Sequence, residues 1–146
     1  MADLKFSIKG ASENPTKFVA EARNFKIIID EPPTLGGTDQ GANPVEYLLA
    51  CYAGCLNVMG HLIAGELGFK LDKLEIEING DLNPDRLFGN SFTERAGFKK
   101  IMITLKPYAE VTPELLERWV QAVENRCPIN DNLRNITPIE IEVLKN

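Results

Sequence analysis

Apolar and polar side chains alternate along several short segments of this chain, as they do in strands that bury one face. The alternation runs over residues 4–9, 17–21, 74–78, 100–105 and 139–143, and a mostly apolar run fills residues 25–30. We interpret each segment as a strand. A turn is expected near Arg23 and Asn24, and Pro and Gly residues predict loops elsewhere.

Two helices are predicted, and each opens with a capping residue followed by proline. The first opens at Asn43 and Pro44, with Glu46 in the position of a capping-box glutamate, and should run to about residue 66. The second opens at Thr112 and is ended by Pro128. A short helical turn is expected over residues 131–135. The order is βββαββαβ, an α+β fold in a single domain over residues 1–146.

The first helix is apolar on nearly every side, which distinguishes it from an ordinary surface helix. Residues 47–65 contain no charged side chain. A membrane span is not expected, because the segment holds Asn57 and His61 and lacks Lys/Arg flanks. A helix of this kind must be covered all round, and the rest of this chain offers too little to cover it. We therefore expect a homodimer with this helix at its centre.

Composition and charge reduce the number of functional classes to which the protein could belong. The chain has 146 residues and a net charge of −5, so nucleic acid is not an expected partner. It holds three cysteines and no apparent secretory segment at its start. We expect a cytoplasmic protein whose thiols are reduced at rest and which has no structural disulfide framework.

Two cysteines occupy different structural settings. Cys55 lies in the middle of the first helix, where it is either an inert small hydrophobe or a nucleophile that needs a nearby cation. Cys127 precedes a proline at a helix end, and we expect it to be accessible and mobile enough to approach another thiol. An ordinary helix-end residue is the alternative. Together they suggest dithiol redox chemistry.

A metal site or a thiol hydrolase is less favoured. Cys51 shares a helix face with Cys55, but His61 points about 240° round the helix from Cys55 and can be neither a shared ligand nor its base. No metal and no cofactor are expected. Arg23 could lower the pKa of a thiol and Glu46 could orient it, although a solvated turn residue and a capping glutamate are the simpler readings.

The combined segments resemble the OsmC/Ohr family of thiol-dependent peroxidases. The matching residues are Leu35-Gly36-Gly37, Gly41-Ala42-Asn43-Pro44, Leu48-Leu49-Ala50, Ala53-Gly54-Cys55 and Cys127-Pro128. The resemblance implies an intertwined homodimer, Cys55 as peroxidatic and Cys127 as resolving cysteine, and Arg23 as the activating arginine. It also implies organic hydroperoxides as substrates and a dithiol as reductant.

The chain departs from that pattern in two places. The best-characterised peroxidases of the family read Asn-Pro-Glu, whereas here Val45 separates Pro44 from Glu46, which moves the carboxylate about 100° round the helix. Cys51 is an additional thiol. Both features are similar to the broader OsmC-like branch. The sequence thus predicts a peroxidase using Cys55, Cys127, Arg23 and Glu46; the alternative is a non-catalytic dimeric protein that binds a small apolar ligand.

Overall fold

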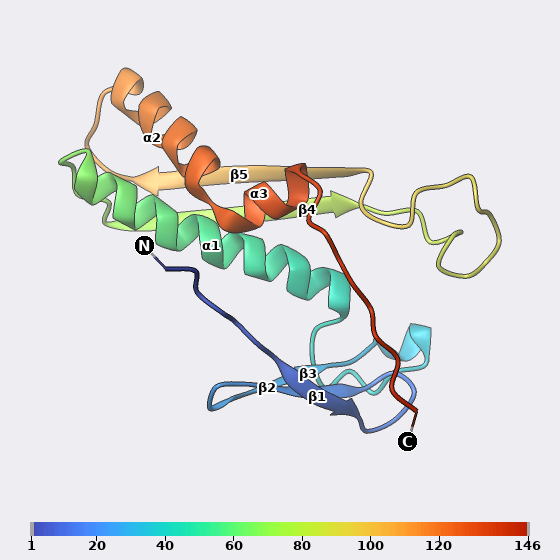
Figure 1. Cartoon of the computed structure of the whole chain (residues 1–146). Helices are drawn as coiled ribbons and strands as arrows, with labels where there is room; N and C mark the ends of the chain where they lie inside the picture. Colours follow the sequence, from blue (N-terminus) through green and yellow to red (C-terminus); the bar gives the residue numbers. More distant parts are fainter. Residues whose placement is uncertain (1, 146) are drawn as a thin grey trace. The chain divides into compact units, whose positions relative to one another are not determined.

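The computed structural model describes residues 2–145 and has the mixed α+β composition that the sequence predicts. Its elements are β1 (Lys9–Ser12), β2 (Phe18–Ala22), β3 (Phe25–Ile29), a 3-10 turn η1 (Pro33–Leu35), α1 (Pro44–Glu66), β4 (Lys73–Asp81), β5 (Lys100–Tyr108), α2 (Pro113–Arg126) and α3 (Pro128–Arg134) (Figure 1). They form two compact units, residues 2–48 and 49–145, which we describe separately.

The first unit is built on an antiparallel sheet in the order β1-β2-β3. The predicted turn between β2 and β3 is confirmed, since Ala22 pairs with Phe25 across a two-residue connection. The predicted strand over residues 4–9 is wrong, because β1 starts only at Lys9. Lys9 pairs with Glu21 close to the end of β2. The chain turns back just beyond that point, so residues before Lys9 find no partner on β2.

A loop between β3 and α1 is organised by one buried carboxylate. Asp30 accepts hydrogen bonds from the backbone of Glu31, Thr38 and Gln40, and from the Thr38 hydroxyl at 2.5 Å. Gly37 is needed in the same loop, because a Cβ there would lie 1.7 Å from the Glu31 carbonyl oxygen. The glycine-rich segment before the helix therefore serves close backbone packing.

The second unit places helices on one face of a hairpin. In β4 and β5 the alternate residues that pack against the core are mainly Leu74, Ile76, Ile78, Ile101, Ile103 and Leu105. The register sets Ile76 opposite Leu105 and Ile78 opposite Ile103, so that both strands present the same apolar face. The opposite face carries polar residues such as Glu77 and Thr104 and is exposed.

The core of this unit lies between the hairpin, α1 and α2. Its buried members are Tyr52, Leu56, Ile63, Ala64, Leu71, Trp119, Val123 and Cys127. Trp119 is fully buried, and its indole nitrogen donates a hydrogen bond to the Gly60 carbonyl of α1 at 2.8 Å. By length and composition α1 could also cross a membrane, but helices that form the core of a protein pass the same test. These contacts place one face of α1 in the core, with Tyr52, Leu56, Gly60, Ile63 and Ala64 as its buried residues.

The ends of the helices follow the predicted caps. Thr112 accepts a hydrogen bond from the Leu115 backbone at 3.3 Å at the start of α2, and α1 ends at Glu66, just before Gly68, whose φ is 79°. The final helical turn is longer than predicted and starts at Pro128. The predicted strand over residues 139–143 is wrong for this chain: within residues 2–145 nothing pairs with it, and Ile141 is 87% exposed.

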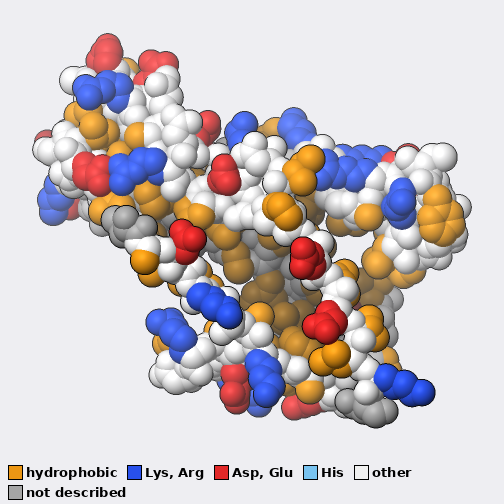
Figure 2. Space-filling view, viewed as in Figure 1, with side chains coloured by type: hydrophobic (Ala, Val, Ile, Leu, Met, Phe, Trp, Pro, Cys, Tyr) orange, Lys and Arg blue, Asp and Glu red, His pale blue; other side chains and the backbone are white. Residues whose placement is uncertain are grey.

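The connection between β4 and β5 is a long loop over residues 82–99. Arg86 holds it together by donating hydrogen bonds to the carbonyls of Phe92 and Glu94, at 2.7 and 3.1 Å. Several of its apolar side chains are exposed, and orange atoms are visible on this loop at the right of Figure 2. Leu87 and Phe92 are 71% and 73% exposed.

Candidate active site

Two of the three cysteines meet inside the second unit. The Cys127 sulfur donates a hydrogen bond to the Cys55 sulfur at 2.8 Å, about 0.8 Å longer than a disulfide bond. Cys55 is partly exposed, whereas Cys127 is only 1% exposed. The expectation that Cys127 is accessible is therefore wrong. The thiol does not need to travel, because the fold already holds it beside Cys55.

The sequence Cys-Pro explains how Cys127 is held there. Cys127 has extended backbone angles and is the last capping residue of α2 and the first of α3. Its backbone N–H still donates to Val123 at 3.1 Å, while its sulfur accepts a hydrogen bond from the Asn130 backbone at 3.4 Å. Pro128 cannot continue α2, so the chain bends and the thiol remains in the core.

The environment of Cys55 disfavours the thiolate. Burial is the main effect that raises the pKa of the Cys55 thiol. A backbone hydrogen bond from Ile129 acts in the opposite direction and is the weaker effect. A thiol in this setting needs an added positive charge to react rapidly near neutral pH.

Arg23 and Glu46, the other two predicted site residues, belong to the first unit. Arg23 occupies the β2–β3 turn with a left-handed φ of 58°, and its guanidinium lies 5.0 Å from the centre of the Phe25 ring. Glu46 accepts a hydrogen bond from the Asn43 backbone, and its own N–H donates to the Asn43 side chain, both at 2.9 Å. The capping-box reading of Glu46 is confirmed, and the catalytic roles of both residues stay predictions.

Next to the thiol pair lies a hydrogen-bonded set of side chains that the sequence did not predict. The Tyr52 hydroxyl donates a hydrogen bond to the side-chain oxygen of Asn130, and Arg134 donates to the same oxygen at 3.0 Å. Burial raises the pKa of Tyr52. Tyr52 lies three residues before Cys55, and Asn130 three after Cys127. That spacing was the only available signal, and it does not reveal that the two residues meet.

The remaining candidates lie apart from this arrangement. Cys51 and His61 are exposed on α1, and within residues 2–145 no three His, Cys, Asp or Glu side chains are grouped to hold a metal ion. Arg126, which precedes Cys127, is engaged by the carboxylate of Glu66 at 3.0 Å.

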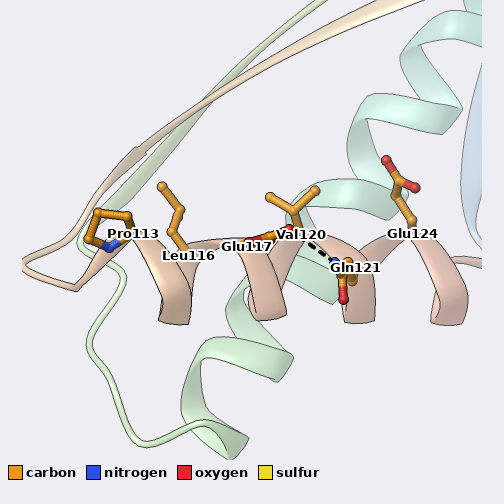
Figure 3. A pocket seen from close by; sticks show the side chains of 6 residues that line it. All are labelled: Pro113, Leu116, Glu117, Val120, Gln121 and Glu124. Carbon is orange, nitrogen blue, oxygen red and sulfur yellow. Dashed lines mark hydrogen bonds between the residues drawn. The ribbon is translucent and has the colours of Figure 1, made fainter.

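One hollow in the surface also lies away from the thiols. It follows a single face of α2 (Figure 3). Its lining residues are Pro113, Leu116, Glu117, Val120, Gln121 and Glu124. Because no thiol lines it, we do not count it as part of the site.

The fold of the chain is that of an OsmC-like protein. The model of the family described as OsmC-like protein matches residues 37–142, and the chain belongs to this family. No curated protein matches the sequence.

Solved structures share the fold at low sequence identity. The OsmC-like protein of Mycoplasma pneumoniae is 20% identical with a TM-score of 0.79, and the match covers 92% of this chain and 91% of that one. An organic hydroperoxide resistance protein OsmC from Legionella pneumophila is 19% identical, with a TM-score of 0.65 and 92% of each chain covered. A Vibrio cholerae protein described as a putative organic hydroperoxide resistance protein, with captopril bound in one active site, is 16% identical with a TM-score of 0.66; coverage is 92% and 87%.

Proposed function

We propose that this protein reduces organic hydroperoxides by a two-cysteine cycle, with Cys55 as the attacking and Cys127 as the resolving thiol. The observation that carries the proposal is the 2.8 Å contact between the two sulfurs. The partly exposed sulfur suits attack on a substrate, and the buried one suits the internal second step. Family membership and the names of its structural neighbours support the same reaction class.

The proposed cycle has three steps: oxidation of Cys55, formation of the disulfide, and its reduction. The Cys55 thiolate attacks the distal oxygen of the hydroperoxide, the O–O bond breaks, and the alcohol leaves after taking a proton. Cys55 is then a sulfenic acid. The Cys127 sulfur attacks the Cys55 sulfur, the S–O bond breaks, and the oxygen leaves as water. An external dithiol reduces the disulfide and is itself oxidised to a disulfide.

Arg23 is the proposed source of the positive charge that Cys55 needs. A non-glycine residue with a left-handed φ costs free energy, and such residues are often retained at functional sites. Arg23 is such a residue: its φ is 58°, and glycine at this turn position would be less strained. Glu46 contributes less to orienting Arg23, because its side-chain oxygen and its backbone N–H already form the capping hydrogen bonds at the start of α1.

The proposal includes a second copy of the chain and a cellular setting. We propose a cytoplasmic homodimer, in which the thiols are reduced between turnovers. No cofactor, nucleic acid or membrane enters the cycle. Cys55 packs against the same apolar core as the partly buried Met59, and such apolar surroundings would favour alkyl hydroperoxides over hydrogen peroxide.

The test compares consumption of cumene hydroperoxide and hydrogen peroxide in the presence of a dithiol. We expect turnover with the organic peroxide, none in Cys55→Ser, and most of the activity in the Cys51→Ser control. Cys127→Ser should be oxidised once and then accumulate sulfinic acid at Cys55. After one equivalent of peroxide, mass spectrometry should find a Cys55–Cys127 disulfide in the wild type. A Cys51–Cys127 disulfide in its place contradicts the assignment.

The raised pKa of Cys55 favours one alternative, a non-catalytic dimeric protein that binds a small apolar ligand. In that case the thiol stays protonated and unreactive near neutral pH. Alkylation of Cys55 as a function of pH separates the two functions. A midpoint near neutrality supports the peroxidase, and a midpoint within or above the ordinary thiol range supports the binding protein.

A further inference from the structure

Beside the thiol pair, the side chain of Asn130 joins three helices. Its oxygen accepts hydrogen bonds from Tyr52 on α1 and from Arg134 on α3, the second at 3.0 Å. Its nitrogen donates to the Glu124 carbonyl in the last turn of α2 at 2.8 Å. Asn130 is only 5% exposed, so water cannot readily replace these partners, and losing one of them leaves a buried polar group unsatisfied.

The same residue also contacts the buried thiol. The Asn130 backbone N–H donates to the Cys127 sulfur at 3.4 Å. Tyr52 lies on α1 one turn before Cys55. The hydrogen bond between Tyr52 and Asn130 therefore connects the helix that carries one sulfur with the turn that carries the other. Two reacting groups that are held in place lose little freedom when they react.

We propose that Asn130 is a positioning residue for the thiol pair, and that its hydrogen bond with Tyr52 holds the two sulfurs within closing distance. This inference rests on the proposed redox function of Cys55 and Cys127. It concerns the second step of the cycle, in which the disulfide forms and water leaves. Asn130 does not touch the peroxide; it acts through the placement of Cys127.

The test uses the equilibrium between the full chain and oxidised and reduced dithiothreitol. This equilibrium measures how strongly the fold favours the Cys55–Cys127 disulfide, and it requires no peroxide. Asn130→Ala should shift the equilibrium constant against the disulfide roughly three- to tenfold, the effect of losing about one net hydrogen bond. Tyr52→Phe removes only the hydroxyl and should shift it in the same direction.

Two further variants separate positioning from general stability. Asn130→Asp keeps an oxygen that accepts from Tyr52 and Arg134 but loses the N–H that donates to the Glu124 carbonyl, so it should recover only part of the shift. Asn132→Ala is the matched control, because Asn132 is an exposed asparagine of α3 that donates to the Pro128 carbonyl at 2.8 Å. It should leave the equilibrium unchanged. The unfolding temperature of each reduced protein is measured in parallel.

Two results of these measurements would overturn the proposal. Wild-type equilibria in both Asn130→Ala and Tyr52→Phe overturn the proposal, as does an equal shift in the Asn132→Ala control. If Asn130→Ala does not fold, Tyr52→Phe decides alone, because it keeps the ring in the core. A protein without peroxidase activity can still show the predicted shift, so failure of the proposed function and failure of this inference remain distinguishable.

Discussion

Among single residues, Arg23 combines an unfavourable backbone conformation with a proposed chemical role. We predict that Arg23→Ala and Arg23→Gly reduce the alkylation rate of Cys55 at pH 7 by roughly tenfold or more, because loss of a nearby charge raises a thiol pKa by about 1–3 units. The two variants should differ in stability. Gly relieves the left-handed φ of 58°, so Arg23→Gly should be more stable than Arg23→Ala by about 1 kcal/mol.

Alkylation profiles and denaturant unfolding of the two variants check this prediction. An unchanged profile in both variants would remove Arg23 from the site. Arg23→Lys keeps the charge and serves as the control, and it should retain most of the reactivity.

Asp30 should make stability depend on acid pH. Its hydrogen bonds, above all that from Thr38, lower the pKa of the carboxyl group from 3.8 to about 2. The unfolded chain therefore binds the proton more readily than the folded one. The stabilisation by Asp30 is complete above about pH 4 and is lost as the pH falls through about 2. Denaturation midpoints of the wild type and Asp30→Asn should converge over that window.

The exposed Asp39 of the same loop provides the control for this titration. Asp39→Asn should follow the wild type at every pH. A gap between wild type and Asp30→Asn that is as wide at pH 2 as at pH 6 would show that the carboxylate charge is not what stabilises the loop.

For secondary-structure elements, the packing of α1 makes a specific prediction at Gly60. A Cβ there would lie 2.9 Å from a Leu74 methyl and 3.1 Å from the Trp119 ring. The indole is fixed by its hydrogen bond to the Gly60 carbonyl, so it has little room to move. Gly60→Ala should therefore destabilise the protein by about 1–3 kcal/mol, despite the better helix propensity of alanine.

The comparison is Gly65→Ala in the same helix. A Cβ at Gly65 would meet nothing within 4 Å, so this variant should gain up to about 1 kcal/mol from helix propensity. Thermal and urea unfolding of the two variants measure both effects. Equal stability changes of the same sign would mean that α1 does not pack as described.

The elements also show what the sequence can specify by itself. Local signals worked: the caps at Asn43 and Thr112 and the turn after β2 all lie where predicted, because each depends on neighbouring residues. Residues 139–143 have the alternation of a strand but form none, because a strand requires a partner edge that the pattern does not supply.

The candidate site was likewise predictable only where it depends on local sequence. Cys55 and Cys127 could be chosen as candidates from their residue type and their positions in the predicted helices. The resemblance to the family then suggested that they react together. The hydrogen bond between Tyr52 and Asn130 spans 78 positions of sequence. It depends on how α3 packs on α1, which no local spacing reveals. The burial of Cys127 was missed for the same reason, since the bend at Pro128 could lead the thiol inward or outward.

At the scale of the whole molecule, uncovered apolar side chains support the proposed homodimer. Val58 and Leu62 on α1 are 63% and 49% exposed, and Ile139 and Ile141 near the C-terminus are 81% and 87% exposed. An extended apolar segment without a ladder partner is ready to pair with another chain. We predict that light scattering finds twice the chain mass of 16.2 kDa at micromolar concentration.

A charge at the proposed interface should disrupt the dimer. Val58→Asp should shift the protein toward a monomer, lower its stability and weaken the concentration dependence of unfolding that a dimeric wild type shows. Met102→Asp is the control, because Met102 is a similarly exposed side chain, at 52%, on the outer face of β5. A well-folded wild-type monomer at micromolar concentration contradicts the proposal.

The burial of Trp119 gives the protein a built-in optical signal. It is the only tryptophan in the sequence, and it lies in the core of the second unit. Its fluorescence should lie at short wavelength in the folded chain and shift to the red when that core opens to water. Residues 2–48 contain no tryptophan, so their unfolding is silent to this emission but visible to circular dichroism. Comparing the two melting curves would show, without any label, whether the two units unfold together as one domain.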